Sequence, residues 1–228
     1  MIVLVVAGGE NPRADALQLA GLASLPTPYV IAADQGISHA LALGLRIDEA
    51  VGDFDSVDPA DLALAKARGA KVEQFSSEKN ASDLELALYA AVAKSPDRIV
   101  VIAGSGGRLD HELVNFLLLA HPDFAKVPIT ALVGGAAVGV IRHRAVLVGQ
   151  AGQFVSLIPM GGDAHGVSTE GLRYVLLDEP LRYGHTRGLS NELTSDRAFV
   201  EVRQGCLLAV APEAPLHIDT ELRFEPSS

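Results

Sequence analysis

Tryptophan is absent from this sequence, and cysteine, methionine and the other aromatic residues are scarce. The 228 residues include one cysteine and two methionines, and Phe, Trp and Tyr together make up 5% of the chain. With Cys206 as the only cysteine, an intrachain disulfide is excluded. The seven histidines are scattered and no Cys-x-x-Cys or His-Glu-x-x-His spacing occurs, so a zinc site is not expected.

Basic residues are also in short supply. Lys and Arg number 18 against 28 Asp and Glu, which gives a net charge of −10 with His neutral. Such a chain lacks the basic footprint that binds nucleic acid or an anionic membrane surface, and neither partner is expected. An anionic ligand such as a nucleotide would therefore need a divalent cation, held by carboxylates, to offset its phosphate charge.

Long uninterrupted apolar segments are missing too. The longest uncharged runs, residues 16–33, 127–141 and 145–162, all contain Pro or Gly, and none is expected to span a membrane. The first residues, MIVLVVAGGENPR, lack the positively charged start of a secretory signal and predict a strand that runs into a glycine turn. We therefore expect a cytoplasmic protein.

The apolar residues, 49% of the chain, follow two different patterns along the sequence. Up to about residue 135, short apolar runs alternate with helical patterns. Strands are expected at 2–7, 29–33, 71–75, 98–103 and 129–133, with helices at about 58–69, from 82 onward, and at 109–120. This alternation predicts an α/β, Rossmann-like domain with a mainly parallel sheet over residues 1–135.

The second pattern begins at residue 136, where no long helical period occurs. Short β-like segments punctuated by Gly, Asn and Pro lie at 137–141, 145–148, 154–159, 172–177, 198–202 and 206–211. Residues 136–228 are therefore predicted to form an all-β domain, a small sandwich or barrel.

Acidic residues are concentrated in one segment, DEAVGDFDSVD, which starts at residue 48. Six carboxylates fall within residues 48–61 without any Lys or Arg, and such groups repel one another unless a cation intervenes. Mg²⁺ commonly binds one or two carboxylates together with substrate phosphates. If the segment is extended, Asp53 and Asp55 point to the same side, and we expect these two to bind Mg²⁺. A solvated acidic loop before a helix explains the other four acidic residues.

A glycine-rich segment, GSGGRLDH at residues 104–111, follows one expected strand and precedes an expected helix. Glycines such as Gly107 allow backbone N–H groups to approach phosphate, and a helix N-terminus favours anions. Arg108 can bind phosphate oxygens through two nitrogens, Asp110 can hold a metal, and His111 can orient or accept a proton. The alternative is a glycine-rich turn with Asp110 in the first turn of the helix.

Helix capping explains a third polar segment, KNASDLE at residues 79–85, without any function. Ser82 and Glu85 have the spacing of a capping box, and Asp83 is favoured by the helix dipole. In the same way, Asp34 is explained by capping of a helix that ends near Gly44.

Taken together, these motifs resemble the thiamine pyrophosphokinase family. The matching segments are AADQGISHAL, VGDFDSV, KNASDLELAL, GSGGRLDHELVNFLLL and GLRYVLLDEPLRYGHTRGLSNEL, which span roughly residues 30–195. The resemblance implies transfer of a diphosphate from Mg²⁺-ATP to the hydroxyl of thiamine, with AMP as the other product. It also implies an α/β catalytic domain, a β-sandwich that binds the vitamin, and a homodimer with its sites between subunits.

The resemblance further assigns roles to individual residues. It implies nucleotide or metal contacts for Asp34, Asp53, Asp55, Ser56, Lys79, Asp83, Arg108 and Asp110, and thiamine contacts for Ser190 and Asn191. Asp83 thereby gains a role that its helix position alone does not require. Some family members stack an aromatic residue, often Trp, on thiamine; because this chain has no Trp, Tyr183 and His185 are the candidates to replace it.

Several alternatives stay open at this point. The proton acceptor for the hydroxyl is either Asp55 or Asp110. A pyrophosphokinase for another hydroxymethyl heterocycle, such as a pterin, would share the catalytic half. A non-catalytic nucleotide or vitamin sensor and a metal-dependent phosphohydrolase are the other two classes.

Overall fold

The computed structural model describes residues 1–23, 25–78, 80–105, 108–212 and 216–221 of a mixed α/β protein. The chain clusters into two compact units, Met1–Leu118 with Ala131–Gly134, and Leu119–Thr130 with Gly135–Ser228. Residues 119–130, which the sequence pattern groups with the first domain, thus cluster with the second unit. Among the described residues, no helix has the length and apolar composition of a membrane span.

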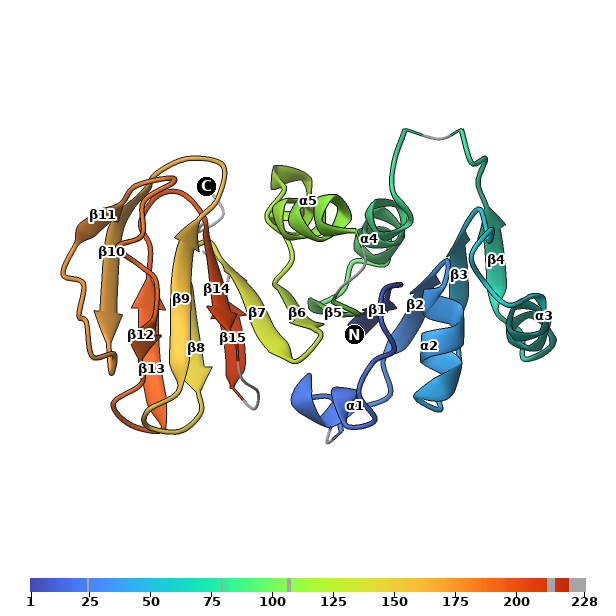
Figure 1. The fold of residues 1–228 in the computed structure, drawn as a ribbon, viewed down its shortest axis with the longest axis horizontal. Coiled ribbons are helices and arrows are strands. Elements are labelled where there is room, and N and C mark those ends of the chain that lie inside the picture. The colour runs from blue at the N-terminus through green and yellow to red at the C-terminus, as the bar shows by residue number, and fades with distance from the viewer. Residues whose placement is uncertain (24, 79, 106–107, 213–215, 222–228) are drawn as a thin grey trace. The chain divides into compact units, whose positions relative to one another are not determined.

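The first unit is built on parallel strands (Figure 1). Its strands have the order β6-β5-β1-β2-β3-β4, and the pairs β5–β1, β1–β2, β2–β3 and β3–β4 are parallel. The central strand is fully buried from Val3 to Val6, as expected of a strand covered on both faces. The strands are β1 (Ile2–Val6), β2 (Tyr29–Ala33), β3 (Glu49–Gly52), β4 (Lys71–Gln74), β5 (Arg98–Ala103) and β6 (Ile129–Val133).

Helices connect these strands, with α2 and α4 on opposite faces of the sheet in Figure 1. Two predicted caps are confirmed: Asp58 accepts a hydrogen bond from the backbone N–H of Ala60 (2.8 Å), and Ser82 Oγ accepts one from that of Glu85 (3.2 Å). The helices are α1 (Ala16–Leu19), α2 (Gly36–Ala42), α3 (Pro59–Ala67), α4 (Asp83–Ala93) and α5 (Leu109–Leu119), followed by the 3₁₀ turn Pro122–Phe124.

The second unit consists of antiparallel strands in two groups. One has the order β12-β9-β14-β7, and the other has the order β11-β10-β13-β8-β15. Buried side chains from both groups, such as Ile141, Leu147 and Leu157, form one core cluster. The strands are β7 (Ala136–Ile141), β8 (Arg144–Val148), β9 (Phe154–Pro159), β10 (Ala164–Glu170), β11 (Glu179–Leu181), β12 (Asn191–Glu192), β13 (Arg197–Glu201), β14 (Leu207–Ala211) and β15 (His217–Glu221).

One predicted strand of this unit is wrong. Residues 172–177 form no strand; Leu172 makes only an isolated bridge to Leu193, and Leu176 N–H donates to Thr169 Oγ1 at 2.9 Å. Leu172 and Leu176 are nevertheless buried, so their apolar character reflects an anchored loop. Conversely, β10 and β15 escaped prediction because AHGVSTE and HIDTE contain too few apolar residues to stand out.

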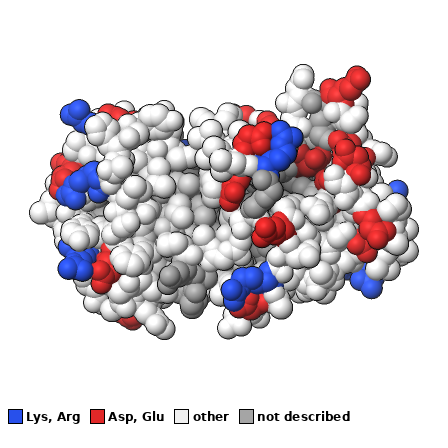
Figure 2. Space-filling model, viewed as in Figure 1, with Lys and Arg blue, Asp and Glu red and all other residues white. Residues whose placement is uncertain are grey.

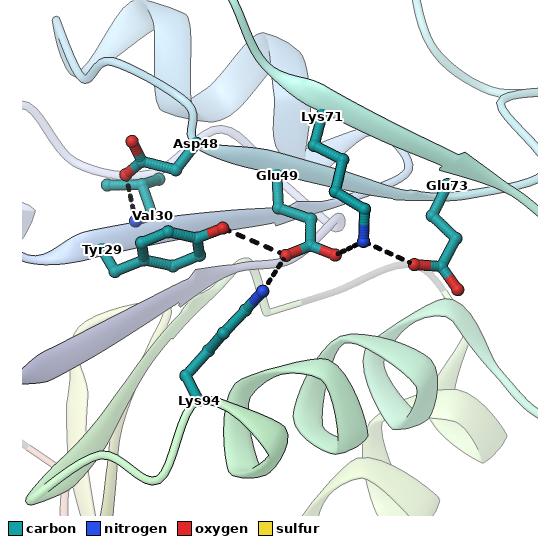
Figure 3. A network of polar contacts seen from close by, with 7 residues as sticks. All are labelled: Tyr29, Val30, Asp48, Glu49, Lys71, Glu73 and Lys94. Carbon is teal, nitrogen blue, oxygen red and sulfur yellow. Dashed lines mark hydrogen bonds and ion pairs between the residues drawn. The ribbon is translucent and has the colours of Figure 1, made fainter.

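A buried carboxylate ties together the strand starts of the first unit (Figure 3). Glu49, the first residue of β3, accepts hydrogen bonds from Tyr29 OH (3.1 Å) and Lys71 Nζ (2.9 Å). Lys94 Nζ, just after α4, lies 2.7 Å from Glu49 Oε2, the oxygen that also accepts from Tyr29, and 5.0 Å from the centre of the Tyr29 ring. The network therefore joins β2, β3, β4 and α4 at the amino end of the sheet.

The assignment of Glu49 to a solvated loop was therefore wrong. Burial raises the pKa of Glu49, but the two lysines lower it by more, so that this pKa lies below its ordinary value of 4.5. Asp48 is also engaged, because it accepts a hydrogen bond from the backbone N–H of Val30 at 2.9 Å. The sequence pattern missed both contacts because the partners lie 18 to 45 residues away along the chain.

We expect Glu49→Gln to destabilise the protein by roughly 2 kcal/mol at pH 7, below the range for a fully buried ion pair because Lys71 and Lys94 are partly exposed. A carboxylate with a lowered pKa stabilises above its unfolded pKa, and this contribution is lost as the pH falls through the folded pKa. The difference in unfolding free energy between the unsubstituted protein and Glu49→Gln should therefore be complete above about pH 4.5 and shrink below that pH. Urea unfolding from pH 7 to pH 3 measures this, with Glu73→Gln as an exposed control expected to change stability by less than about 0.5 kcal/mol.

Candidate metal-binding site

Three carboxylates meet at the carboxyl edge of the parallel sheet. Asp34 follows β2, Asp53 follows β3, and Asp83 is the first residue of α4. One oxygen from each lies within 4.8 Å of the other two. Because parallel strands all end at the same edge, segments up to 49 residues apart in the sequence deliver their side chains to one place. On the face drawn in Figure 2, acidic and basic side chains are scattered over a surface that is mostly uncharged.

The backbone at this site adopts conformations that side-chain-bearing residues rarely accept. Asp34 has φ 45° and Phe54 has φ 62°, both in the left-handed region. Such conformations cost roughly 1–3 kcal/mol each and are found preferentially where function requires them. The local geometry is therefore imposed by the surrounding fold.

The turn at Phe54 overturns the assumption that residues 53–55 are extended. Strand alternation would place Asp53 and Asp55 on one side, but a left-handed residue between them breaks that alternation. Asp55 is exposed, accepts a hydrogen bond from Ser56 Oγ at 2.7 Å, and does not belong to the group of three carboxylates. The structure instead groups Asp53 with Asp34 and Asp83.

Electrostatics at Asp34 favour a cation. Burial raises the pKa of Asp34, the negative charges of Asp83, Asp55 and Asp53 raise it further, and a backbone hydrogen bond at Gln35 opposes them. Asp34 Oδ1 is buried and accepts no hydrogen bond among the described residues. A buried oxygen without a donor is costly, and a bound cation relieves this cost.

The donor set fits a hard divalent cation. All three side chains offer carboxylate oxygens, the ligands that Mg²⁺ and Ca²⁺ prefer, and neither sulfur nor imidazole takes part. Asp34 does not cap α2, because the N-cap position is Gln35 and no side-chain hydrogen bond is made there. The expectation that Asp34 caps this helix was therefore wrong.

Arg108 and Asp110 are paired with each other. Arg108 Nε lies 3.1 Å from Asp110 Oδ1, and Arg108 Nη2 lies 2.6 Å from Asp110 Oδ2. Both side chains are exposed, and the guanidinium group lowers the pKa of Asp110 to about 2. Asp110 does not belong to the group of three carboxylates. Two other expected site residues, Lys79 and Gly107, lie outside the described residues.

Sequence reasoning overlooked the glycine turn after β1 as part of this edge. Gly104 N–H donates to Gly8 O at 3.1 Å, and a Cβ on Gly104 would lie 2.2 Å from the backbone nitrogen of Glu10. Gly9 N–H donates to Gln35 Oε1 at 3.3 Å. The turns after β1 and β5 are thus in direct contact beside Asp34. The Gly-Gly pair directly after a buried strand was the available signal.

Comparison with known proteins assigns the family. The profile described as "Thiamin pyrophosphokinase, catalytic domain" matches residues 25–131, and the profile "Thiamin pyrophosphokinase, vitamin B1 binding domain" matches residues 142–207. The chain belongs to the thiamine pyrophosphokinase family. The family resemblance found in the motifs is thereby confirmed.

Relatives of this family resemble the chain over nearly its whole length. Thiamine pyrophosphokinase from Bacillus subtilis (strain 168) is 28% identical over 208 residues, which cover 90% of this chain and 96% of that protein. The crystal structure of thiamine pyrophosphokinase from Bacillus subtilis has a TM-score of 0.77 at 25% identity, covering 94% and 100% of the two chains. The crystal structure of the Geobacillus thermodenitrificans protein has a TM-score of 0.76 at 26% identity, covering 94% and 99%.

The residues that the thiamine pyrophosphokinase resemblance assigns to the vitamin lie in the second unit. Ser190 is exposed with φ 53°, and its N–H donates to Ser156 Oγ at 3.1 Å. Asn191 is buried: its Oδ1 accepts from Tyr174 N–H (2.9 Å), and its Nδ2 donates to Tyr174 O (2.8 Å). The Asn191 amide therefore holds the backbone of Tyr174, whose ring is exposed.

Asp34→Asn should stabilise the metal-free protein at pH 7 by an amount on the order of 1 kcal/mol, because it removes a partly buried charge beside other carboxylates. The pKa of Asp34 in the folded protein is above its unfolded value of 3.8. The destabilisation caused by the charged Asp34 carboxylate is therefore complete above the folded pKa. It should disappear as the pH falls through the folded pKa and below about 3.8. Thermal unfolding in EDTA between pH 7 and pH 3 tests this; a less stable variant at pH 7 would contradict the electrostatic account.

Proposed function

We propose that this chain is a thiamine pyrophosphokinase, which transfers a diphosphate group from ATP to the hydroxyl of thiamine and releases AMP. The observation that carries the proposal is the convergence of Asp34, Asp53 and Asp83 within the region matched by the family's catalytic domain. The match of residues 142–207 to the family's vitamin B1 binding domain supports thiamine as the acceptor of the diphosphate.

Asp34, Asp53 and Asp83 would hold Mg²⁺. When bound, Mg²⁺ neutralises phosphate charge and orients the phosphates, which phosphoryl chemistry requires more than covalent assistance. Asp55, the other expected ligand, adds negative charge to this site, since it contributes to the raised pKa of Asp34. Ser56 holds the Asp55 carboxylate through a hydrogen bond.

Arg108 and Lys79 are proposed to bind the phosphate oxygens of the transferred group. Arg108 binds both oxygens of the Asp110 carboxylate through Nε and Nη2. A guanidinium group can bind two phosphate oxygens in the same bidentate way. With a pKa of about 2, Asp110 is a weak base while this pair persists, so we propose Asp55 as the proton acceptor for the hydroxyl. Gly107 would offer its backbone N–H to phosphate.

Thiamine specificity is proposed to reside in the second unit. Ser190 would contact the vitamin, and Asn191 would act by positioning Tyr174. The exposed Tyr174 ring thus joins Tyr183 and His185 as a candidate to stack on the vitamin in place of Trp.

The finer architecture is part of the same proposal. We assign residues 1–135 to a Rossmann-like catalytic domain and residues 136–228 to a β-sandwich that binds thiamine. The parallel sheet of the first unit and the core shared by two antiparallel strand groups in the second support this assignment. A homodimer with its sites between subunits and a cytoplasmic location are likewise proposed, on the family resemblance.

Mass spectrometry of the products from ATP, Mg²⁺ and thiamine tests the proposed activity. Thiamine diphosphate and AMP in equal amounts are the expected products, and neither should form without metal. AMP release without thiamine would identify a phosphohydrolase, and turnover of a pterin alcohol in preference to thiamine would identify a different acceptor. Binding of ATP and thiamine without turnover would identify a sensor.

Asp53→Asn should lower kcat for AMP formation by about 100-fold or more, because an amide is a poorer Mg²⁺ ligand than a carboxylate. Circular dichroism and thermal unfolding check that the fold is retained. Asp61→Asn, in the same acidic segment but outside the carboxylate group, is the matched control and should keep kcat within about twofold. Unsubstituted-like turnover in Asp53→Asn would remove Asp53 from the metal site.

A further inference from the structure

Gly52, the last residue of β3, lies directly beside the carboxylates of the candidate metal site. It is buried and has φ +151°, a conformation that favours glycine. A Cβ at this position would lie 3.2 Å from Asp34 Cβ, 3.3 Å from Asp34 Cα and 3.2 Å from Asp83 Oδ1. Carbon atoms in van der Waals contact normally stay about 3.5–4.0 Å apart, so a methyl group here would press on both acidic residues at once.

Asp34 is poorly able to move away from such a methyl group. Its N–H donates to Val51 O at 2.9 Å, and its carbonyl accepts from Ile37 N–H at 3.0 Å, so strand β3 and the start of helix α2 both hold it. The left-handed φ of 45° at Asp34 depends on these contacts. Displacement of Asp34 would therefore require movement of the sheet edge itself.

Asp83 has a different constraint. It is the first residue of α4, whose start is held by the hydrogen bond from Glu85 N–H to Ser82 Oγ. Its backbone is thus fixed, and the contact with a new methyl group falls on its carboxylate oxygen Oδ1. A methyl group at position 52 would consequently act mainly by turning the Asp83 carboxylate away from Asp34.

We propose that Gly52 is a positioning residue of the metal site, since the missing side chain leaves the space in which the Asp34 and Asp83 carboxylates face each other. The inference rests on the proposed function for the identity of the bound ion, a hard divalent cation. Gly52 itself contacts neither ion nor substrate in this role. It sets the separation of two ligands on different elements, and separation decides metal affinity because Mg²⁺ demands near-ideal geometry.

A second glycine offers a matched control. Gly44, which follows α2, also has a positive φ (+72°), but a Cβ there would meet no atom within 4 Å. Gly44→Ala therefore imposes the backbone strain of an L residue at a positive φ without touching the site. Comparison of Gly52→Ala with Gly44→Ala separates the effect on the carboxylates from the effect on the backbone.

The test measures Mn²⁺ binding to the protein without nucleotide or thiamine, by titration calorimetry, alongside thermal unfolding. We expect Gly52→Ala to weaken Mn²⁺ binding at least tenfold, and Gly44→Ala to leave it within about twofold. The Mg²⁺ concentration needed for half-maximal AMP formation should rise in Gly52→Ala alone. Equal Mn²⁺ affinity in the two folded variants, or no Mn²⁺ binding by the unsubstituted protein, would overturn the inference.

A double variant keeps the test decisive if Gly52→Ala folds poorly. Gly52→Ala combined with Asp83→Ala removes the oxygen against which the new methyl group presses. Asp83→Ala also removes a charge from the carboxylate group, so its effect on Tm in EDTA is measured both in the Gly52→Ala background and in the unsubstituted protein, and the gain should be larger in the Gly52→Ala background. An equal gain in both backgrounds would overturn the inference. Absence of thiamine diphosphate among the products of the unsubstituted protein would instead refute the proposed activity, and the comparison of Mn²⁺ affinities would still decide the role of Gly52.

Discussion

Repulsion between carboxylates is the constraint on which the proposed site depends. Asp34, Asp53 and Asp83 are brought together although their charges oppose it; the pKa of Asp34 is raised mainly by burial and further by the neighbouring carboxylates. The fold sustains this arrangement because each acid is attached to an element that is stable for other reasons. Two are attached to the ends of buried parallel strands, and the third to a capped helix. The divalent cation that we propose for this site would offset the repulsion.

Two acidic residues at the ends of strand β3 lie in opposite electrostatic environments. At its start, Glu49 is buried but offset by Lys71, Lys94 and the Tyr29 hydroxyl, so the network stabilises the sheet. Immediately after its end, Asp53 faces other carboxylates. The lysines and the tyrosine offset the charge of Glu49 within the protein, whereas for the group that contains Asp53 we propose a bound cation.

Local sequence patterns predicted the elements that local physics controls. The caps at Asp58 and Ser82 were predictable because a side chain bonds a backbone group two or three residues away. The continuous apolar runs of the first unit likewise marked its buried strands. Prediction failed where burial came from distant partners: residues 172–177 form an anchored loop, and β15 is too polar to be recognised. The prediction that Asp53 and Asp55 point to the same side failed because Phe54, between them, has a left-handed conformation set by tertiary context, which changes the direction of the chain.

The sequence by itself determined the excess of acid, the absence of a disulfide, the two folding patterns and the motifs that place the chain in its family. These properties depend on composition and on the spacing of residues that are close in the sequence, so they can be recognised without the structure. Only the tertiary structure decided that Asp34 and Asp83, rather than Asp55, lie with Asp53, and that Asn191 holds Tyr174. Those outcomes depend on how strands pair and where each one ends, because parallel pairing brings together side chains that are far apart along the chain.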